Sequence, residues 1–174
     1  MSENSNDKLA AAIWRLGRNR ADSDAWRLAQ DQLWPRLFAT SFRLFEGDDE
    51  QATIATKSAL TVLFNYSQFV TFMEYPDAFQ SLALAACRAL SLLLAKQKSE
   101  PGEAPREVGE IPATSIDVLA RFSLWVDESR RTFLDLILEG YSVAQVAAEL
   151  KIVRSSAILQ ILAFRHQLAR LLRQ

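Results

Sequence analysis

The 174-residue sequence has little that could bind a metal or act as a nucleophile, since it contains one cysteine and one histidine. A lone Cys87 cannot form a disulfide within the chain and is expected in the core, whereas a lone His166 is expected at the surface. Together they make neither a metal-ligand cluster nor a nucleophile–base pair, and the sequence has no glycine-rich phosphate-binding loop. We therefore expect a protein that is not an enzyme, with no catalytic residue, metal, cofactor or small-molecule substrate.

Glycine and proline are also scarce, with five of each. This scarcity disfavours a turn-rich all-β fold and favours long regular elements. The net charge is −1, so the chain lacks the overall positive charge of proteins that rely on phosphate contacts. Any nucleic-acid surface must therefore be local.

Segments that would direct the chain to a membrane are not evident either. The first eight residues, MSENSNDK, lack the basic and apolar stretches of a secretory signal. The most apolar segment, residues 82–95, is shorter than the roughly 20 residues that cross a bilayer, and it contains Arg88. We therefore expect a cytoplasmic protein.

Apolar residues recur at helical spacing along almost the whole chain, which predicts an all-α fold. Pro35 should kink or restart the second helix, because proline has no N–H to donate. The acidic run 48–50 suits the positive N-terminal end of the third helix. The tryptophans at 14, 26, 34 and 125 lie on apolar stripes and are expected in the core. The expected helices cover approximately residues 7–17, 23–47, 48–64, 76–97, 116–126, 128–138, 143–150 and 154–172.

The segment 98–115 differs in composition from the rest of the chain. It holds three of the five prolines, two glycines and several glutamates, but few large apolar residues. Such a composition is typical of a flexible linker. The sequence therefore predicts two small helical domains, 1–97 and 116–174, joined by this linker.

The stretch LEGYSVAQVAAELKI, residues 138–152, carries the strongest local pattern. Gly140 lets one helix end and the chain turn, and Ser142 can cap the next helix. Ala147 supplies the small residue that a close helix–helix contact needs, and Ser155 or Ser156 should begin the last helix. This pattern is typical of a helix-turn-helix pair, whose second helix can enter the major groove of DNA. An ordinary helical hairpin has the same pattern, so both interpretations stay open.

Longer motifs resemble a known family. DQLWPRLFATSFRLFEGDDEQA, SALTVLF and YPDAFQSLALAACRALSLLLAKQK resemble region two of extracytoplasmic-function sigma factors, especially the sigma-like proteins of planctomycete-type bacteria. ESRRTFLDLILEGYSVAQVAAELKI is similar to the start of sigma region four, and the resemblance covers about residues 24–174. It implies a region two-like domain, a region four-like helix-turn-helix domain, and a cytoplasmic role in transcription initiation. The implied partners are core RNA polymerase, promoter DNA and an anti-sigma or other regulatory protein.

Several positions depart from the pattern of that family. Ile54 and Lys57 stand where family members carry an acid and often a glutamine that help bind the polymerase. Cys87, Ser91 and Leu94 stand where family members carry asparagine, aspartate and arginine around the promoter-melting segment. Both the polymerase-binding and the DNA-melting chemistry are therefore altered.

The last helix departs in a similar way. Ile158, Leu159 and Leu162 occupy positions that face the groove in the family, and such an apolar patch indicates a protein partner. The inward positions keep their apolar character; they are Ala157, Ile161, Phe164 and Leu168.

Positive charge nevertheless gathers at the end of the chain, because residues 151–174 include no acid. Arg154 and Arg165 are expected to hold phosphates, and Ser155, Ser156 and Gln160 are the candidates for base contacts. Two hypotheses remain. The first is a sigma factor or sigma-like regulator that binds polymerase through the side bearing Ile54 and Lys57 and a promoter through both domains. The second is a sigma-like interaction module that binds a protein through its last helix and binds little DNA.

Overall fold

The structure is a computed structural model, and it describes residues 5–66, 68–99 and 113–174. These residues form helices and no strand, which confirms the expected all-α fold. The helices are α1 Ser5–Arg18, α2 Ser23–Leu44, α3 Asp49–Tyr66, α4 Phe69–Phe72, α5 Pro76–Ser99, α6 Ala113–Trp125, α7 Glu128–Leu138, α8 Val143–Glu149 and α9 Arg154–Leu172.

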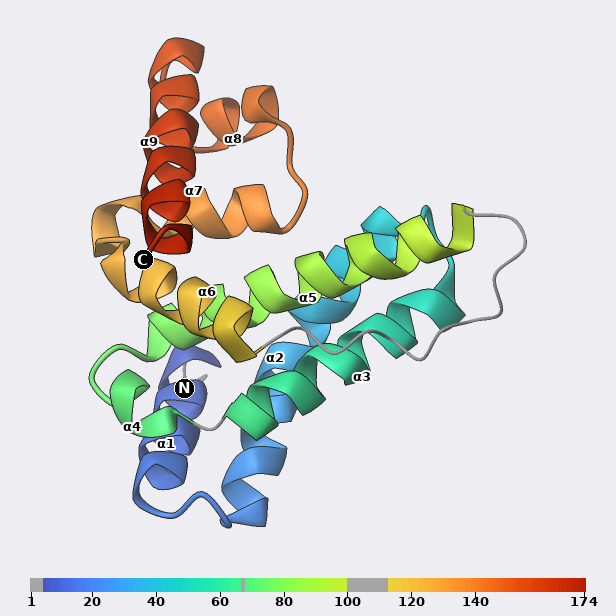
Figure 1. Ribbon diagram of the computed structural model, residues 1–174, viewed down its shortest axis with the longest axis vertical. Coiled ribbons are helices and arrows are strands. Elements are labelled where there is room, and N and C mark those ends of the chain that lie inside the picture. The colour runs from blue at the N-terminus through green and yellow to red at the C-terminus, as the bar shows by residue number, and fades with distance from the viewer. Residues whose placement is uncertain (1–4, 67, 100–112) are drawn as a thin grey trace.

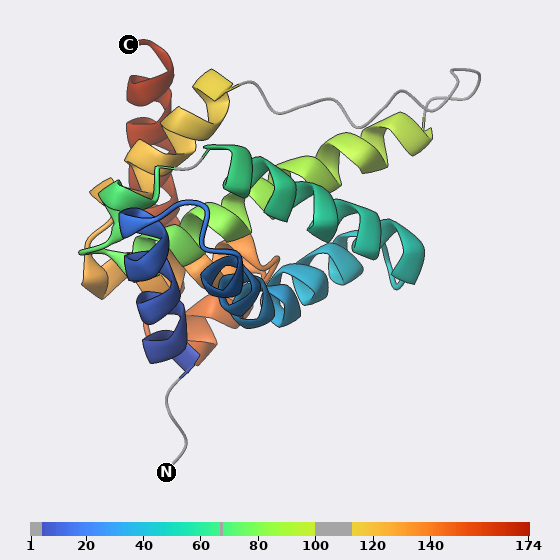
Figure 2. The ribbon, with the colours of Figure 1, turned by 90° about the horizontal axis from the view of Figure 1, so that it is seen from below.

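The first five helices enclose a single apolar core. Helix α1 contributes Leu9, Ile13 and Leu16, whose spacing puts them on one helical face. Helices α2 and α3 both pack against α5, and Figure 2 shows α3 lying beside α5. The expected helical periodicity therefore matches the buried face of each long helix.

Capping residues fix where α2 and α3 begin. The Asp22 carboxylate accepts a hydrogen bond from the backbone N–H of Ala25 at 2.9 Å, and Arg15 of α1 binds the same carboxylate at 3.0 Å. Asp48 accepts from the N–H of Gln51 at 3.1 Å, so the acidic run 48–50 does begin α3. Both caps satisfy N–H groups that the first turn of a helix leaves without a partner.

Two details of this part differ from expectation. Helix α2 continues through Pro35 without a restart and ends at Leu44, before Gly47. The short helix α4 was not expected; it is held by the buried side chains of Phe69 and Phe72. Four residues are too few to show helical periodicity in a sequence, which explains why this helix was missed.

Small polar side chains allow α2 and α5 to pack closely. The Ser41 hydroxyl lies 3.0 Å from the Cys87 sulfur and 2.9 Å from the Ser91 hydroxyl, and all three residues are fully buried. Burial raises the pKa of the Cys87 thiol. The expectation of a buried Cys87 is confirmed.

Helix α5 extends beyond both ends of the apolar segment 82–95 that was considered as a membrane span. By length and composition, residues 76–97 could cross a membrane, but most of that stretch is packed inside the helical core. The core helix of a soluble protein has the same character.

The last four helices build a second core around Phe122, Phe133 and Phe164. Helix α6 joins both cores, because Ile116 and Ala120 pack with the first five helices. Helix α7 also packs against α5, and Figure 1 shows α7, α8 and α9 on one side of α5 and α3 on the other, while α2 passes behind α5. The two parts of the chain are therefore in contact along α5, α6 and α7.

The ends of the expected linker are helical. Residues 98 and 99 belong to α5, and residues 113–115 belong to α6. The remainder, residues 100–112, lies outside the described residues.

The tryptophans are less buried than expected. Trp14 and Trp125 are 48% and 38% exposed, and Trp26 and Trp34 are partly buried. Each of the two exposed rings is covered by an arginine. The guanidinium carbon of Arg18 lies 4.8 Å from the centre of the Trp14 ring, and that of Arg130 lies 4.7 Å from the centre of the Trp125 ring. A guanidinium stacked on an indole stabilises it without full burial.

Candidate functional site

The α7–α8 turn has the geometry expected from its glycine and serine. Gly140 has φ +96°, and the N–H of Tyr141 donates to the Leu136 carbonyl at 3.1 Å, which forms a Schellman motif. The Ser142 hydroxyl then accepts from the N–H of Gln145, while the Gln145 side chain accepts from the N–H of Ser142. This capping box fixes the start of α8 and confirms the predicted role of Ser142.

The α8–α9 turn repeats the Schellman motif with a lysine in the left-handed position. Lys151 has φ +54°, and the N–H of Ile152 donates to the Ala147 carbonyl at 3.0 Å. Glycine is usual at such a position because a side chain strains it, so no residue in the sequence marks the left-handed backbone of this turn. Ile152 then packs into the second core, where it secures the turn.

Close packing joins α8 to α9. Val146, Ala147 and Ala157 are buried, and the Phe164 ring meets Phe133 at 5.9 Å. Helix α9 therefore packs against α8 through small residues near the turn, and against α6 and α7 through an aromatic cluster further along. This packing is compatible with a helix-turn-helix pair and with an ordinary helical hairpin.

Helix α9 has the expected bounds, but the serines expected at its start do not cap it. The helix begins at Arg154, so neither Ser155 nor Ser156 caps it. Val153 occupies the N-cap position and has no side chain that could accept a hydrogen bond from the first turn. The first-turn N–H groups of α9 therefore lack side-chain capping from this residue, and they lie beside the positive charges of Lys151 and Arg154.

The candidate DNA-binding residues lie along α9. Arg154, Ser155 and Arg165 are exposed, whereas Ser156 is half-buried. Gln160 is also half-buried, and its Oε1 is enclosed without a hydrogen-bond partner among the described residues. The two arginines and Ser155 are thus available to a ligand, and a base contact from Gln160 stays a prediction.

The candidate protein-binding residues of α9 point to solvent. Ile158, Leu159 and Leu162 are 43%, 66% and 53% exposed. The inward positions pack in the second core as predicted; they are Ala157, Ile161, Phe164 and Leu168. Helix α9 therefore carries apolar residues on both its inner and its outer face.

The two candidate polymerase-binding residues lie one turn apart on α3. Ile54 is 36% exposed and Lys57 is exposed. Lys57 also lines a groove of about 490 Å³ between α2 and α3, together with Trp26, Trp34 and Phe64. The structure therefore places an exposed apolar residue, a lysine and an aromatic-lined groove on one side of the N-terminal part.

The residues aligned with the promoter-melting segment are all inside the core. Cys87 and Ser91 are fully buried and Leu94 is 9% exposed. Buried side chains at these three positions cannot touch DNA while the fold is intact.

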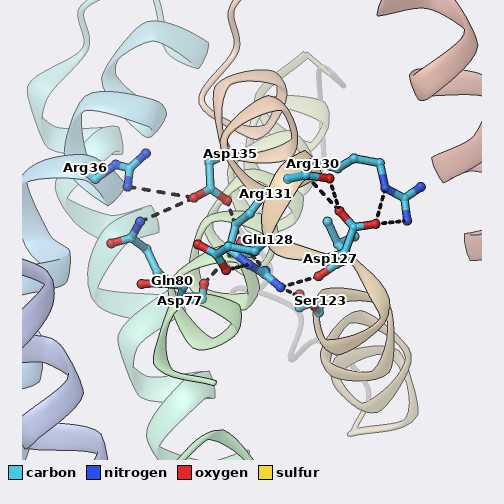
Figure 3. A network of polar contacts seen from close by, with 12 residues as sticks. Arg36, Asp77, Gln80, Ser123, Asp127, Glu128, Arg130, Arg131 and Asp135 are labelled. Atoms are coloured by element: carbon cyan, nitrogen blue, oxygen red, sulfur yellow. Dashed lines mark hydrogen bonds and ion pairs between the residues drawn. The ribbon is translucent and has the colours of Figure 1, made fainter. Parts of the chain in front are cut away.

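A network of arginines and acids joins α7 to the N-terminal helices (Figure 3). Arg36 of α2 forms an ion pair with Glu139 and lies 4.0 Å from the Asp135 carboxylate. Asp135 also accepts hydrogen bonds from Ser81 at 2.6 Å and from Gln80 at 3.4 Å, both on α5. Burial raises the pKa of the Asp135 carboxyl, while the Ser81 hydrogen bond and the Arg36 charge oppose that rise.

Two further arginines bind the C-terminal carbonyls of α7. Arg43 of α2 donates to the Glu139 carbonyl at 2.8 Å, and Arg88 of α5 donates to the Leu138 carbonyl at 3.3 Å. Positive groups at this end complement the negative pole of the helix. We call the contacts of Arg36, Arg43 and Arg88 with α7 the arginine clasp.

Sequence reasoning missed the clasp. Its partners are separated by 50 to 103 residues, and no local spacing connects them. The only available signal was a pair of acids, Asp135 and Glu139, at i, i+4 spacing among the apolar residues at the end of α7.

Comparison of the chain with known proteins finds no matching protein family, no matching curated protein and no matching solved structure.

The close contact of α8 with α9 predicts that Ala147 tolerates no large side chain. Ala147→Leu should lower the free energy of unfolding by about 1–3 kcal/mol, because extra volume in a packed contact forces its neighbours apart. Ala148→Leu is the matched control, since Ala148 is exposed on the same helix. Denaturant unfolding of both variants checks this, and equal midpoints for the two would contradict the packing described here.

The clasp predicts a selective role for Arg36. Arg36→Ala leaves the buried Asp135 carboxylate without its cation and should cost about 1–2 kcal/mol at neutral pH, a value reduced by the partial exposure of Arg36. Arg27→Ala, an exposed position on the same helix, should change stability by less than about 0.5 kcal/mol.

The pH dependence gives a second check of the clasp. Losing the Arg36 charge removes one of the effects that lower the pKa of Asp135, so the variant takes up its proton at a higher pH than the wild type does. The stability difference between Arg36→Ala and wild type should therefore shrink as the pH falls towards the usual range of an aspartate, about 4. Unfolding curves at pH 7 and pH 4 measure this, and an unchanged difference would show that the Arg36 charge is not what stabilises the contact.

Proposed function

We propose that this chain is a sigma-like transcription regulator, in which the α8–α9 pair binds the DNA backbone and the α2–α3 side binds core RNA polymerase. The observation that carries the proposal is that α8 and α9 are joined by a tight turn and that α9 belongs to an acid-free, basic segment. From Lys151 to the end of the chain there is no Asp or Glu, although the whole chain has a net charge of −1. Local positive charge of this kind attracts phosphates.

The geometry of α9 supports backbone binding more than base reading. Arg154 and Arg165 are exposed near the two ends of the outer face, and Ser155 is exposed in the first turn. Phosphate contacts position a protein on DNA without reading its sequence. Since Ser156 and Gln160 are half-buried, we propose that the isolated chain binds duplex DNA with weak sequence preference.

The proposed polymerase contact rests on Ile54 and Lys57. They are exposed one turn apart on α3, and Lys57 lines the groove that contains Trp26 and Trp34. Apolar and aromatic residues of this kind are frequent anchors in protein interfaces. The proposed cytoplasmic location follows from this role.

A second candidate function is that of a protein-interaction module with little DNA binding. The outer face of α9 favours it, because Leu159 and Leu162 are more than half exposed where a DNA-reading helix carries polar groups. The burial of Cys87 and Ser91 points the same way, because it removes two positions that the sigma resemblance assigns to promoter melting. In that case an anti-sigma or other regulatory protein is the proposed partner.

The DNA-binding proposal is tested with mixed-sequence duplex DNA over a range of salt concentrations. Arg154→Ala and Arg165→Ala should each weaken binding to all sequences and lower the slope of log K against log salt by about 1. Gln160→Ala should change sequence preference more than total affinity. Arg27→Ala on α2 is the control and should bind as wild type. The proposal is contradicted if both arginine variants bind DNA as tightly as wild type does, or if the wild-type chain does not bind DNA at low salt.

The polymerase proposal is tested by gel filtration with purified core RNA polymerase. An Ile54→Glu, Lys57→Glu double variant should lose at least about tenfold in affinity, because it places negative charge in an apolar contact. Val70→Glu is the control, since Val70 is 68% exposed on α4. Equal retention of the double variant and the control would place the polymerase contact elsewhere.

A further inference from the structure

We propose that the outer face of α9 docks an acidic amphipathic helix of a partner protein. This inference goes beyond the proposed DNA binding, because it needs only the outward side chains of α9 and stands whether or not the chain binds DNA.

The first argument is that α9 has too many apolar residues for a helix with one free face. Its inner face packs Ala157 and Phe164 into the second core, while Ile158, Leu159 and Leu162 remain on the outer face. A helix that is apolar on all sides is normally covered on all sides. No described residue buries these three side chains, which leaves them open to contact with another molecule.

The second argument is the order of charged and apolar residues along the outer face. Arg154, Ile158, Leu162 and Arg165 follow one another at i, i+4, i+8 and i+11, so they form one stripe with an arginine at each end. At 1.5 Å per residue this stripe is about 17 Å long. A partner helix of roughly three turns, with leucine-like residues in the middle and carboxylates at both ends, complements it.

The third argument excludes a second copy of the chain as the occupant. Lys151, Arg154, Arg165, Arg170 and Arg173 are all exposed, and residues 151–174 contain no acid. Two α9 helices placed face to face would bring these like charges together. The nearest acid before this segment is Glu149, on α8, and it leaves the field along α9 positive. Charge complementarity therefore requires an acidic partner.

DNA supplies negative charge but not an apolar surface of matching size. The edges of the bases are mainly hydrogen-bonding groups, and among them only the thymine methyl is apolar. Burying Leu159 and Leu162 against a protein helix removes more apolar surface from water than exposing them in a groove does. The observations thus favour a protein helix as the occupant of this face.

The test uses the full chain and two synthetic fluorescent peptides of about four helical turns. Both carry leucine at i, i+3, i+4 and i+7 positions; one has glutamate and the other has lysine at the remaining positions. Fluorescence anisotropy should show that the glutamate peptide binds at least about tenfold more tightly than the lysine peptide. Its affinity should fall with salt, because the arginine contacts are exposed.

Two variants locate the contact. Leu159→Ser with Leu162→Ser should keep the wild-type melting temperature, because both side chains are exposed, and should weaken the glutamate peptide at least about tenfold. Val70→Ser, which changes an equally exposed apolar residue on α4, should leave peptide binding unchanged. The inference is overturned if the two peptides bind equally well or if neither binds. It is also overturned if the double variant binds the glutamate peptide as tightly as wild type does.

Duplex DNA and sedimentation separate this inference from the alternatives. If the glutamate peptide binds and DNA does not, the inference stands and the proposed DNA binding falls. If DNA binds with unchanged affinity in the Leu159→Ser, Leu162→Ser variant and the peptide does not bind, the inference falls and the proposed function stands. A dimer that the double variant dissociates would make a second copy the occupant and would also overturn the inference.

Discussion

The arrangement of this protein depends on the arginine clasp between α7 and the N-terminal helices. Arg36, Arg43 and Arg88 reach from α2 and α5 to the acids and terminal carbonyls of α7. Two turns, each closed by a Schellman hydrogen bond, then connect α7 to α8 and α8 to α9. The clasp therefore contributes to where the outer face of α9 lies relative to α2 and α3.

The sequence predicted the long helices well, because their periodicity and caps are local. The predicted helix ends are confirmed at three residues: a turn forms at Gly140, and the side chains of Ser142 and Asp48 cap the helices that follow them. What could not be predicted depends on residues far apart in the chain or on strain. The clasp joins partners up to 103 residues apart, and Lys151 adopts a backbone conformation that its side chain disfavours.

The candidate site was predicted in part. The exposure of Ile158, Leu159 and Leu162 and the inward packing of Phe164 follow directly from 3.6-residue periodicity. Two features were not predicted. Gln160 is half-buried and its Oε1 is enclosed. Trp14 and Trp125 lie at the surface, each stacked under an arginine. Helical periodicity predicts on which face of a helix a residue lies. It does not predict how much of that residue the neighbouring side chains cover.

These features support the proposed role of α9 as the binding surface of a sigma-like regulator, because its arginines suit phosphates or carboxylates and its leucines suit a protein. The most direct test of that role is transcription by purified core RNA polymerase on genomic DNA fragments, with and without the full chain. The account predicts that the chain stays bound to the polymerase and changes which fragments are transcribed. A chain that neither binds the polymerase nor changes its transcripts would contradict it.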